Sequence, residues 1–297
     1  MSTTLTVFTP TYNRAHTLQR TYNSLLKQTC HDFEWLIIDD GSSDTTSSLV
    51  DEWINEQKIS IRYIYKENGG LYTAYNTAYQ NIDSELCVCI DSDDYMPDDA
   101  VEKIIRCWKT RGGEQYAGLM GLDFRLDNTP IGGYFPKNLH EVWFMDLYLK
   151  KLHLGDTKPV LRTSLMKRVA PMEGFPGEKN FNPVYMMMQV CDKYPILLLN
   201  ENLCYVDYQT GTDSMSAGIW RQYMNSPFSF QKQRILEMQL AHNTWLNRIR
   251  VAIHYVASSI IARDRQWLRK SPLKCITILV SPFGLLLYLL ILYKSKQ

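Results

Sequence analysis

Three aspartates lie close together in the tetrad Asp91-Ser92-Asp93-Asp94, directly after the apolar run Leu86 to Ile90. Clustered carboxylates repel one another and are costly to remove from water, so they do not stabilise a strand end by themselves. A divalent cation relieves both problems, and oxygen ligands suit Mg²⁺ or Mn²⁺. The tetrad therefore predicts a metal site and, through the metal, a phosphate-bearing substrate. A solvated acidic turn before the next helix is the alternative, because two aspartates at this spacing are common in proteins.

The elements that must position the tetrad alternate between strands and helices over the first hundred residues. The pattern predicts strands at residues 5–9, 34–38, 61–65 and 86–90, and helices at about 15–28, 49–54 and 71–80. Such alternation indicates an α/β fold with a mostly parallel sheet and helices on both faces. Ligands bind beyond the carboxyl ends of the strands in such sheets, and the unusual polar clusters of this sequence all follow strands.

Four motifs in order carry a resemblance to a known family. They are Thr9-Pro10-Thr11-Tyr12-Asn13-Arg14, then Ile37-Ile38-Asp39-Asp40-Gly41-Ser42-Ser43-Asp44, then Asn68-Gly69-Gly70 with Ala74 and Asn76, and finally the tetrad. Together they resemble family 2 glycosyltransferases, which have the Rossmann-like GT-A fold. The resemblance covers residues 1 to about 215 and is strongest up to about Asp99. It implies a domain at 1–216, with a nucleotide-binding half at 1–99 and an acceptor half at 100–216.

The resemblance places a donor nucleotide at the ends of the first strands. Pro10, Thr11 and Tyr12 would line its base. Asp40 would accept a hydrogen bond from that base, and Asp39 would support the same loop. The residues implied for nucleotide binding are Pro10, Thr11, Tyr12, Asn13, Arg14, Asp39, Asp40, Asn68, Gly69, Gly70, Asp91 and Ser92. Ordinary glycine-containing turns remain the alternative at residues 40–41 and 68–70.

By the same resemblance, Asp91 and Asp93 would hold the nucleotide ribose and the Mn²⁺ or Mg²⁺ that bridges the two phosphates. Asp93 is the expected direct ligand, and Asp94 would orient the site or contact the donor sugar. A cation at this position stabilises the negative charge that develops on a leaving diphosphate. Family members of this architecture invert the anomeric centre in one displacement. We therefore expect a nucleotide-sugar donor, with UDP as the expected nucleotide.

Inversion needs a base for the acceptor hydroxyl, and relatives carry a glutamate some 80 to 90 residues after the metal motif. Glu178 is the first candidate here, Glu173 the second and Asp192 a distant third. Val184 stands where a subgroup has a second glutamate, and valine cannot accept a proton. A structural role for Glu178, and a non-catalytic glycosyltransferase-like scaffold, are the alternatives.

Two further segments resemble that subgroup. The stretch Gly155-Asp156-Thr157-Lys158 lies where relatives have residues near the acceptor or donor pocket. Residues 208–216 resemble a flexible loop that closes over the diphosphate and excludes water. The implied lid residues are Thr212, Asp213, Ser214 and Ser216. A surface loop without a function is the alternative, because it would have the same glycine and serine content.

The region 217–297 is basic and then apolar. Six cations between Arg248 and Lys270 precede Lys274, and residues 275–293 form a 19-residue tail without a charge. This pattern predicts a helical surface for anionic lipid headgroups rather than for nucleic acid. Ser281-Pro282-Phe283-Gly284 interrupts the tail, so it forms either one kinked span, or two short helices in one leaflet, or a buried helix of the globular body. We expect a peripheral protein on the cytoplasmic side of the inner or plasma membrane, anchored in monotopic or single-span fashion.

Composition adds few constraints. The formal charge of +1 indicates no partner, and the seven cysteines show no metal-ligand spacing, as expected in a reducing compartment. The combined expectation is a metal-dependent hexosyltransferase that uses a lipid-linked glycan acceptor in cell-surface polysaccharide synthesis. A nucleotidyltransferase is a weaker alternative, because such enzymes carry a glycine-rich basic segment where this chain has Pro10 to Arg14.

Overall fold

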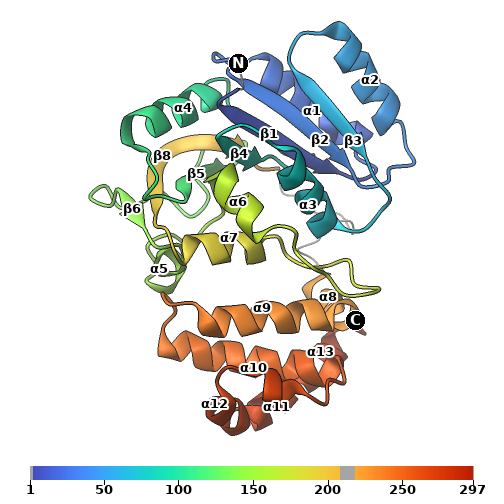
Figure 1. Cartoon of the computed structure of the whole chain (residues 1–297), viewed down its shortest axis with the longest axis vertical. Coiled ribbons are helices and arrows are strands. Elements are labelled where there is room, and N and C mark those ends of the chain that lie inside the picture. The colour runs from blue at the N-terminus through green and yellow to red at the C-terminus, as the bar shows by residue number, and fades with distance from the viewer. Residues whose placement is uncertain (1–2, 208–217, 297) are drawn as a thin grey trace.

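The computed structural model describes residues 3–207 and 218–296. One eight-stranded sheet with its helices forms the upper part of the molecule, and a group of helices forms the lower part (Figure 1). The strands are β1 (Leu5–Thr11), β2 (Phe33–Asp39), β3 (Ile61–Tyr65), β4 (Leu86–Cys89), β5 (Gly118–Phe124), β6 (Glu141–Val142), β7 (Thr157–Arg162) and β8 (Ile196–Tyr205). Their order in the sheet is β3-β2-β1-β4-β7-β5-β8-β6.

The described helices divide between the sheet and the lower part. Those that accompany the sheet are α1 (Ala15–Leu26), α2 (Thr46–Glu56), α3 (Leu71–Asn81), α4 (Ala100–Arg111), α5 (Phe144–Leu149), α6 (Thr163–Val169) and α7 (Val184–Cys191). The lower helices, called the helical unit below, are α8 (Ile219–Asn225), α9 (Pro227–Gln239), α10 (Trp245–Ile261), α11 (Trp267–Lys270), α12 (Lys274–Leu279) and α13 (Ser281–Lys294).

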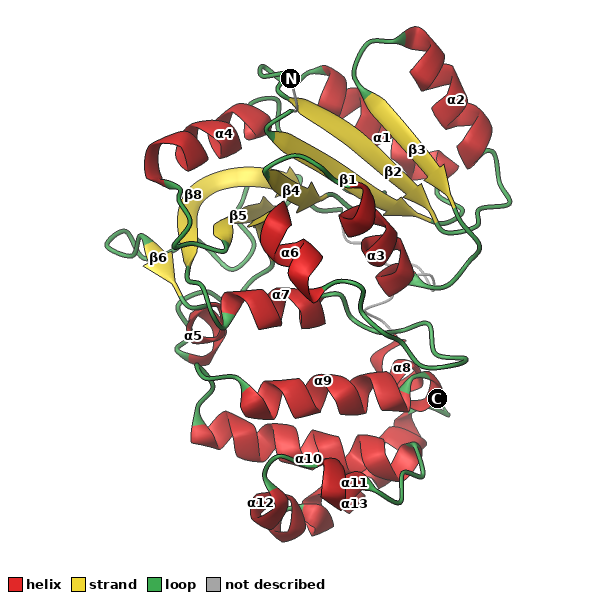
Figure 2. Cartoon of the chain, in the orientation of Figure 1, coloured by secondary structure: helices red, strands yellow, loops and turns green. Residues whose placement is uncertain are grey.

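The predicted α/β arrangement is confirmed. Strands β3, β2, β1 and β4 are parallel neighbours, as the alternating pattern indicates. Their alternate residues face opposite sides, because successive side chains of a strand point in opposite directions. Val7 and Trp35 belong to the core under α1, α2 and α4, while Phe8 and Leu36 belong to the core under α3, α6 and α7. Figure 2 shows α3 and α6 in front of the strands.

The second half of the sheet is mixed. Strand β7 is antiparallel to both of its neighbours, β4 and β5, and β6 is antiparallel to β8. Strand β5 is parallel to β8, with register shifts between Met120 and Asp123. The antiparallel strand β7 therefore carries residues 157–162 to the centre of the sheet, next to the strand that precedes the tetrad.

The helical unit has its own apolar interior. Met238, Tyr255 and Val256 form one cluster between α9, α10 and α12, and Ala257 and Ile291 join α10 to α13 in another. The apolar tail folds as two helices, α12 and α13, that meet at Val280. Within residues 3–207 and 218–296, no helix combines the length and the hydropathy that a bilayer crossing requires.

Candidate functional site

The polar motifs of the first half meet at one edge of the sheet. Thr11, the last residue of β1, pairs with Asp39 at the end of β2. The backbone N–H of Asp40 donates to the Thr11 carbonyl at 2.9 Å, and that of Ile90 donates to the Phe8 carbonyl at 3.0 Å. The loops after β1, β2 and β4 thus leave the sheet side by side, where parallel strands place their ligands.

The loop after β1 is fixed to the loop after β2 by Asn13. Its backbone has the left-handed value φ 53°, which asparagine tolerates better than most residues. Its side-chain Oδ1 accepts a hydrogen bond from the backbone of Ser43 at 2.8 Å, and its own N–H donates to Ser42 Oγ at 2.8 Å. Asn13 therefore holds the two loops together, whereas the neighbouring Tyr12 ring is half exposed and available to a ligand.

Asp39 and Asp40 are both buried and both engaged. Asp39 Oδ1 accepts from the Ser42 N–H at 2.7 Å, and Oδ2 accepts from the Tyr63 hydroxyl at 2.6 Å. These two contacts fix the start of the turn that contains Gly41, whose φ of 87° suits glycine.

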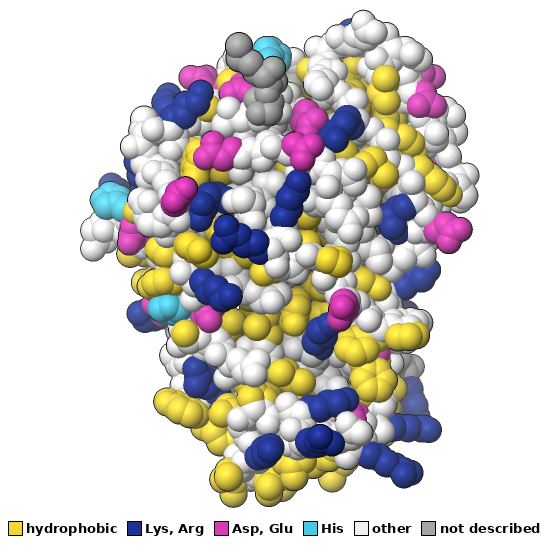
Figure 3. Space-filling view, in the orientation of Figure 1, with side chains coloured by type: hydrophobic (Ala, Val, Ile, Leu, Met, Phe, Trp, Pro, Cys, Tyr) yellow, Lys and Arg dark blue, Asp and Glu magenta, His cyan; other side chains and the backbone are white. Residues whose placement is uncertain are grey.

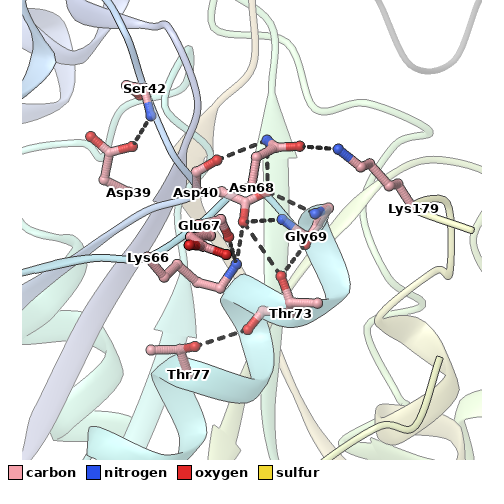
Figure 4. A network of polar contacts seen from close by, with 11 residues as sticks. Asp39, Asp40, Ser42, Lys66, Glu67, Asn68, Gly69, Thr73, Thr77 and Lys179 are labelled. Carbon is pink, nitrogen blue, oxygen red and sulfur yellow. Dashed lines mark hydrogen bonds and ion pairs between the residues drawn. The ribbon is translucent and has the colours of Figure 1, made fainter. Parts of the chain in front are cut away.

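Asp40 is the centre of the network in Figure 4. Its carboxylate accepts from the N–H groups of Gly69 and Gly70, at 2.9 and 2.8 Å, and forms an ion pair with Lys66. Because the residue as a whole is only 5% exposed, these partners occupy the acceptor positions of its carboxylate. The hydrogen bond to a nucleotide base stays a prediction, and the observed role of Asp40 is to shape the turn at residues 68–70.

Two carboxylates of the tetrad, those of Asp91 and Asp93, are accessible to a ligand, with Cys89 Sγ at 3.8 Å from Asp91 Oδ1. Asp91 is exposed and Asp93 is half buried, and neither forms an ion pair with any residue in the described part of the chain. Burial and the charge of Asp91 both raise the pKa of the Asp93 carboxyl. Arg20 holds the loop in place, since its guanidinium donates to the Asp93 carbonyl at 2.6 Å and to Asp207 at 2.9 Å.

These two carboxylates fit a divalent cation that is shared with a ligand. Across residues 3–207 and 218–296, no group of three or more acidic, histidine or cysteine side chains is arranged to hold a metal. Mg²⁺ is commonly bound through one or two carboxylates together with substrate phosphates and water, and two mutually repelling oxygen ligands meet that requirement. The chain would thus supply Asp91 and Asp93, and the phosphates would complete the coordination.

A buried cluster of charged side chains connects the tetrad to β7 and β5. Lys158 Nζ, on β7, lies 3.8 Å from Asp94 Oδ2 and 3.8 Å from Asp123 Oδ1, and all three side chains are buried. Burial raises the pKa of Asp94 to about 7, with Asp91 and Asp93 acting in the same direction and Lys158 in the opposite one. Asp94 therefore faces the interior, and its ion pair with Lys158 fixes the last residue of the tetrad against β7.

The candidate bases occupy different surroundings. Both oxygens of Glu178 accept hydrogen bonds from the first turn of α9, from the N–H groups of Phe228 at 2.9 Å and Ser229 at 2.7 Å. Ser229 Oγ donates to Glu178 as well, and the residue is 7% exposed. Asp192 similarly accepts from the N–H groups of Ala241 and His242.

Glu173, by contrast, is exposed and close to α3. Its backbone carbonyl accepts from Lys232 Nζ at 3.0 Å, and its carboxylate has no hydrogen bond or ion pair with the described residues. The next residue, Gly174, packs directly against the Tyr72 hydroxyl, where a Cβ would come within 2.2 Å. The geometry therefore favours Glu173 over Glu178 as an available carboxylate, and the identity of the base stays a prediction. The lid residues Thr212, Asp213, Ser214 and Ser216 lie outside the described residues.

Sequence reasoning missed the cations that organise this edge. Lys66 follows the end of β3, and Arg20 lies on α1. Single basic residues are common at such positions and belong to no recognisable motif. The resemblance places Lys158 only in a loop near the pocket, although a lysine within the run Thr157 to Arg162 is unusual for a central strand. A lysine next to the apolar residues Pro159, Val160 and Leu161 of a strand is the available signal for a buried ion pair.

Part of the chain is similar in sequence to known proteins. Residues 6–119 match the family model described as glycosyl transferase family 2. A segment of 102 residues is 33% identical to Glycosyltransferase GlyA of Streptococcus pneumoniae, and covers 34% of this chain and 14% of that protein. A segment of the same length is 34% identical to hyaluronan synthase of Pasteurella multocida, over 10% of that protein. The matched segment thus spans about a seventh to a tenth of these curated relatives.

Solved structures share the fold over nearly the whole chain. Residues 1–349 of S. aureus TarS superpose with a TM-score of 0.63 and 15% identity, over 99% of this chain and 92% of that one. The mannosyltransferase PcManGT from Pyrobaculum calidifontis, solved with GDP-Man and Mn²⁺, gives a TM-score of 0.55 and 14% identity, over 96% and 88%. At these identities the likeness shows the fold alone, and it extends through the mixed half of the sheet and the helical unit.

Proposed function

Because residues 6–119 belong to glycosyl transferase family 2, we propose that the chain transfers a sugar from a nucleotide-sugar donor to a glycan acceptor. The observation that carries the proposal is the pair of unpaired carboxylates, Asp91 and Asp93, at the same sheet edge as the half-exposed Tyr12. An aromatic ring next to an acidic pair suits a ligand that has a base at one end and a diphosphate at the other.

Different residues of the chain would bind the base, the ribose and the diphosphate of the donor. Tyr12 would stack on the base, and the turn at residues 68–70, held by Asp40, would bring backbone close to the ribose. Asp91 and Asp93 would hold a divalent cation, which when bound neutralises charge on the leaving diphosphate. Mn²⁺ is supported by the PcManGT complex. Arg20 keeps the Asp93 backbone in position through the 2.6 Å hydrogen bond to its carbonyl.

A UDP-sugar is the proposed donor. Solved neighbours include S. aureus TarS in complex with UDP-GlcNAc and with UDP, whereas PcManGT was solved with GDP-Man. The curated relatives named chondroitin synthase and hyaluronan synthase also favour a role in polysaccharide synthesis. The exposed apolar helices α12 and α13 favour an acceptor glycan linked to lipid, because they would keep the site near a membrane.

In the proposed reaction the acceptor hydroxyl attacks the anomeric carbon opposite the diphosphate, which inverts that centre. The bond from carbon to phosphate oxygen breaks, the diphosphate leaves with the electron pair, and a carboxylate takes the hydroxyl proton. Glu173 is the carboxylate we propose for this step, because it is exposed and unpaired among the described residues. Glu178 is instead held by α9.

The test is release of nucleoside diphosphate from a panel of UDP- and GDP-sugars, with Mn²⁺ or with a chelator. We expect metal-dependent release from one class of donor, and loss of release in Asp93→Asn. Asp98→Asn, which neutralises an exposed aspartate five residues further on, is the matched control and should release nucleotide like the wild type. Equal release by Asp93→Asn would contradict the proposal.

A non-catalytic scaffold is the second candidate. Val184, the half-buried first residue of α7, and the capping role of Glu178 both favour it, because neither position then offers a base. It predicts metal-dependent binding of a nucleoside diphosphate without release from any sugar donor, so the same panel with a binding readout separates the two candidates.

A further inference from the structure

Helices α12 and α13 expose a continuous set of large apolar side chains. Only Gly284 and Ile291 of α13 are buried, and Gly284 packs so closely on α10 that a Cβ would come within 2.4 Å of Val256. The exposed side chains are Ile278, Leu279, Phe283, Leu285, Leu286, Leu289, Leu290 and Tyr293. In Figure 3 apolar side chains gather at the lower end of the molecule, among Lys and Arg side chains. Apolar patches of this kind mark interaction sites.

Unpaired cations lie beside this apolar face. Arg263, Arg265, Arg269 and Lys274 are exposed and form no ion pair with any described residue. The acid among them, Asp264, is already bound to Lys270 at 2.7 Å and to Gln231 at 2.9 Å. Figure 3 shows Lys and Arg side chains next to the apolar lower end. The partner of this face must therefore combine negative charge with hydrocarbon.

A cavity of about 690 Å³ opens between α10 and α13 at the junction of the two surfaces. Its apolar walls come from Val256, Ile260, Trp267, Pro282 and Leu285. Polar side chains that also line it are those of Ser259, Arg263, Asp264, Arg265 and Ser281, of which Asp264 is paired with Lys270. An apolar cavity with two guanidinium groups suits an amphiphile that has an anionic head and a hydrocarbon chain.

The turn at the end of α10 explains the position of Arg263 at the cavity. Arg263 follows the end of α10 with φ 51°, the left-handed conformation that favours glycine at this position. The Arg263 N–H donates to the Ile260 carbonyl, and the Asp264 N–H donates to the Ser259 carbonyl, both at 3.1 Å. This turn ends α10 and carries Arg263 and Arg265 to the wall of the cavity.

We propose that this cavity and the adjoining face of α12 and α13 bind an anionic phospholipid of a bilayer. Arg263 and Arg265 bind its phosphate, and its hydrocarbon chain enters the cavity while the exposed leucines enter the bilayer surface. A second copy of this chain fits less well, because a symmetric pairing of the face would bring the same unpaired cations together. The inference does not depend on the sugar-transfer proposal.

The test is co-sedimentation of the full chain with vesicles of phosphatidylcholine, with and without phosphatidylglycerol. We expect the wild type to sediment with the anionic vesicles. The double variant Arg263→Gly with Arg265→Ala should lose about thirtyfold in affinity, since each cation near an anionic surface contributes about 1 kcal/mol. The matched control removes two exposed cations near the sheet, Lys109→Ala with Lys137→Ala, and should bind as the wild type does.

Two further readouts keep the proposal falsifiable. Arg263→Gly should raise Tm, because glycine relieves the left-handed backbone, while it weakens vesicle binding. Leu286→Ser with Leu290→Ser, both at exposed positions, should reduce binding to all vesicles.

Wild type that stays in the supernatant, or a double arginine variant that binds like the wild type, would overturn the proposal. Self-association that Leu286→Ser abolishes, without vesicle binding, would assign the face to a second copy. Stabilisation by UDP should persist in all these variants, which separates this test from that of the donor site.

Discussion

Lys179 Nζ donates a hydrogen bond to Asn68 Oδ1 at 2.5 Å, across 111 residues of sequence. Asn68 Nδ2 in turn donates to the Asp40 carbonyl at 2.8 Å (Figure 4). The residue before Lys179 is Glu178, which accepts three hydrogen bonds from the first turn of α9. One series of polar contacts therefore connects the end of β2, the turn before α3 and the helical unit. A substitution in one of these segments should therefore shift the position of the other two.

Neutralising Asp40 should destabilise the fold. Asp40→Asn leaves Lys66 without its anionic partner and weakens the bonds to Gly69 and Gly70, in a place where the Asp40 side chain is 7% exposed. Breaking a buried ion pair by removing one partner costs about 3 kcal/mol. Thermal denaturation should show a lower Tm. The matched control is Asp83→Asn, whose ion pair with Lys167 is mostly exposed and contributes at most about 1 kcal/mol. Equal loss in both variants would contradict the role given to Asp40.

Gly70 and Gly177 both have positive φ, but only Gly70 lies in close contact with another segment. Substituting each by alanine therefore shows how much that contact adds to the cost of the backbone conformation. A Cβ on Gly70 would lie 2.4 Å from the Lys179 carbonyl oxygen, whereas one on Gly177 would meet nothing within 4 Å. Gly177→Ala should cost about 1 kcal/mol from the left-handed backbone alone. Gly70→Ala should cost about 2 kcal/mol more, because its ψ of 162° is open almost only to glycine and because the turn must move away from residue 179. Urea denaturation of the two variants measures the difference, and similar losses would mean that the two segments are not in close contact.

The two candidate bases should respond differently to removal of their charge. Glu178→Gln should lower the free energy of unfolding by about 1 kcal/mol, because a neutral amide caps the helix less well than a carboxylate. Glu173→Gln should leave Tm unchanged and lower sugar transfer by about 100-fold or more, the usual contribution of a general base. Donor binding should survive in both variants. If Glu178→Gln abolishes transfer while Glu173→Gln does not, the assignment made here is reversed.

His254 should make the helical unit sensitive to acid. Burial, assisted by the charges of Arg234 and Arg250, lowers the pKa of His254 to about 4, and its Nδ1 lies 2.9 Å from the Tyr223 hydroxyl. The unfolded chain binds this proton near pH 6.5, so stability is lost as pH falls from about 6.5 to about 4 and does not change further below that. The loss amounts to at most about 3 kcal/mol. Tm measured across this range should fall less steeply in His254→Gln than in the wild type, and parallel curves would exclude the effect.

The first half of the fold was predictable because its signals are local. Strand periodicity, glycine turns and the tetrad each occupy a few adjacent residues, and parallel topology then places the motifs at one edge of the sheet. The second half was not predictable in this way. Strand β7 lies between β4 and β5, which precede it in sequence, and only packing of distant segments places it there.

The difference between local and distant contacts also explains which site residues could be predicted from the sequence. The acidic tetrad is visible in the sequence, but the engagement of Asp40 by residues 66–70 depends on how the turn folds back. Glu178 looked like a base from its position in a motif, and its hydrogen bonds come from residues 50 positions away. No local pattern identifies the partner of a side chain when that partner is distant in sequence.

The most direct test of the donor site is thermal denaturation with UDP and GDP, each with Mn²⁺ or with a chelator. Wild type and Asp98→Asn should gain stability from one nucleotide only when Mn²⁺ is present, by about 2.7 kcal/mol at a ligand concentration of 100 Kd. Asp93→Asn should fold normally and show no gain, because Asp91 alone cannot hold the cation. No stabilisation of the wild type by either nucleotide, or an unchanged gain in Asp93→Asn, would contradict the account.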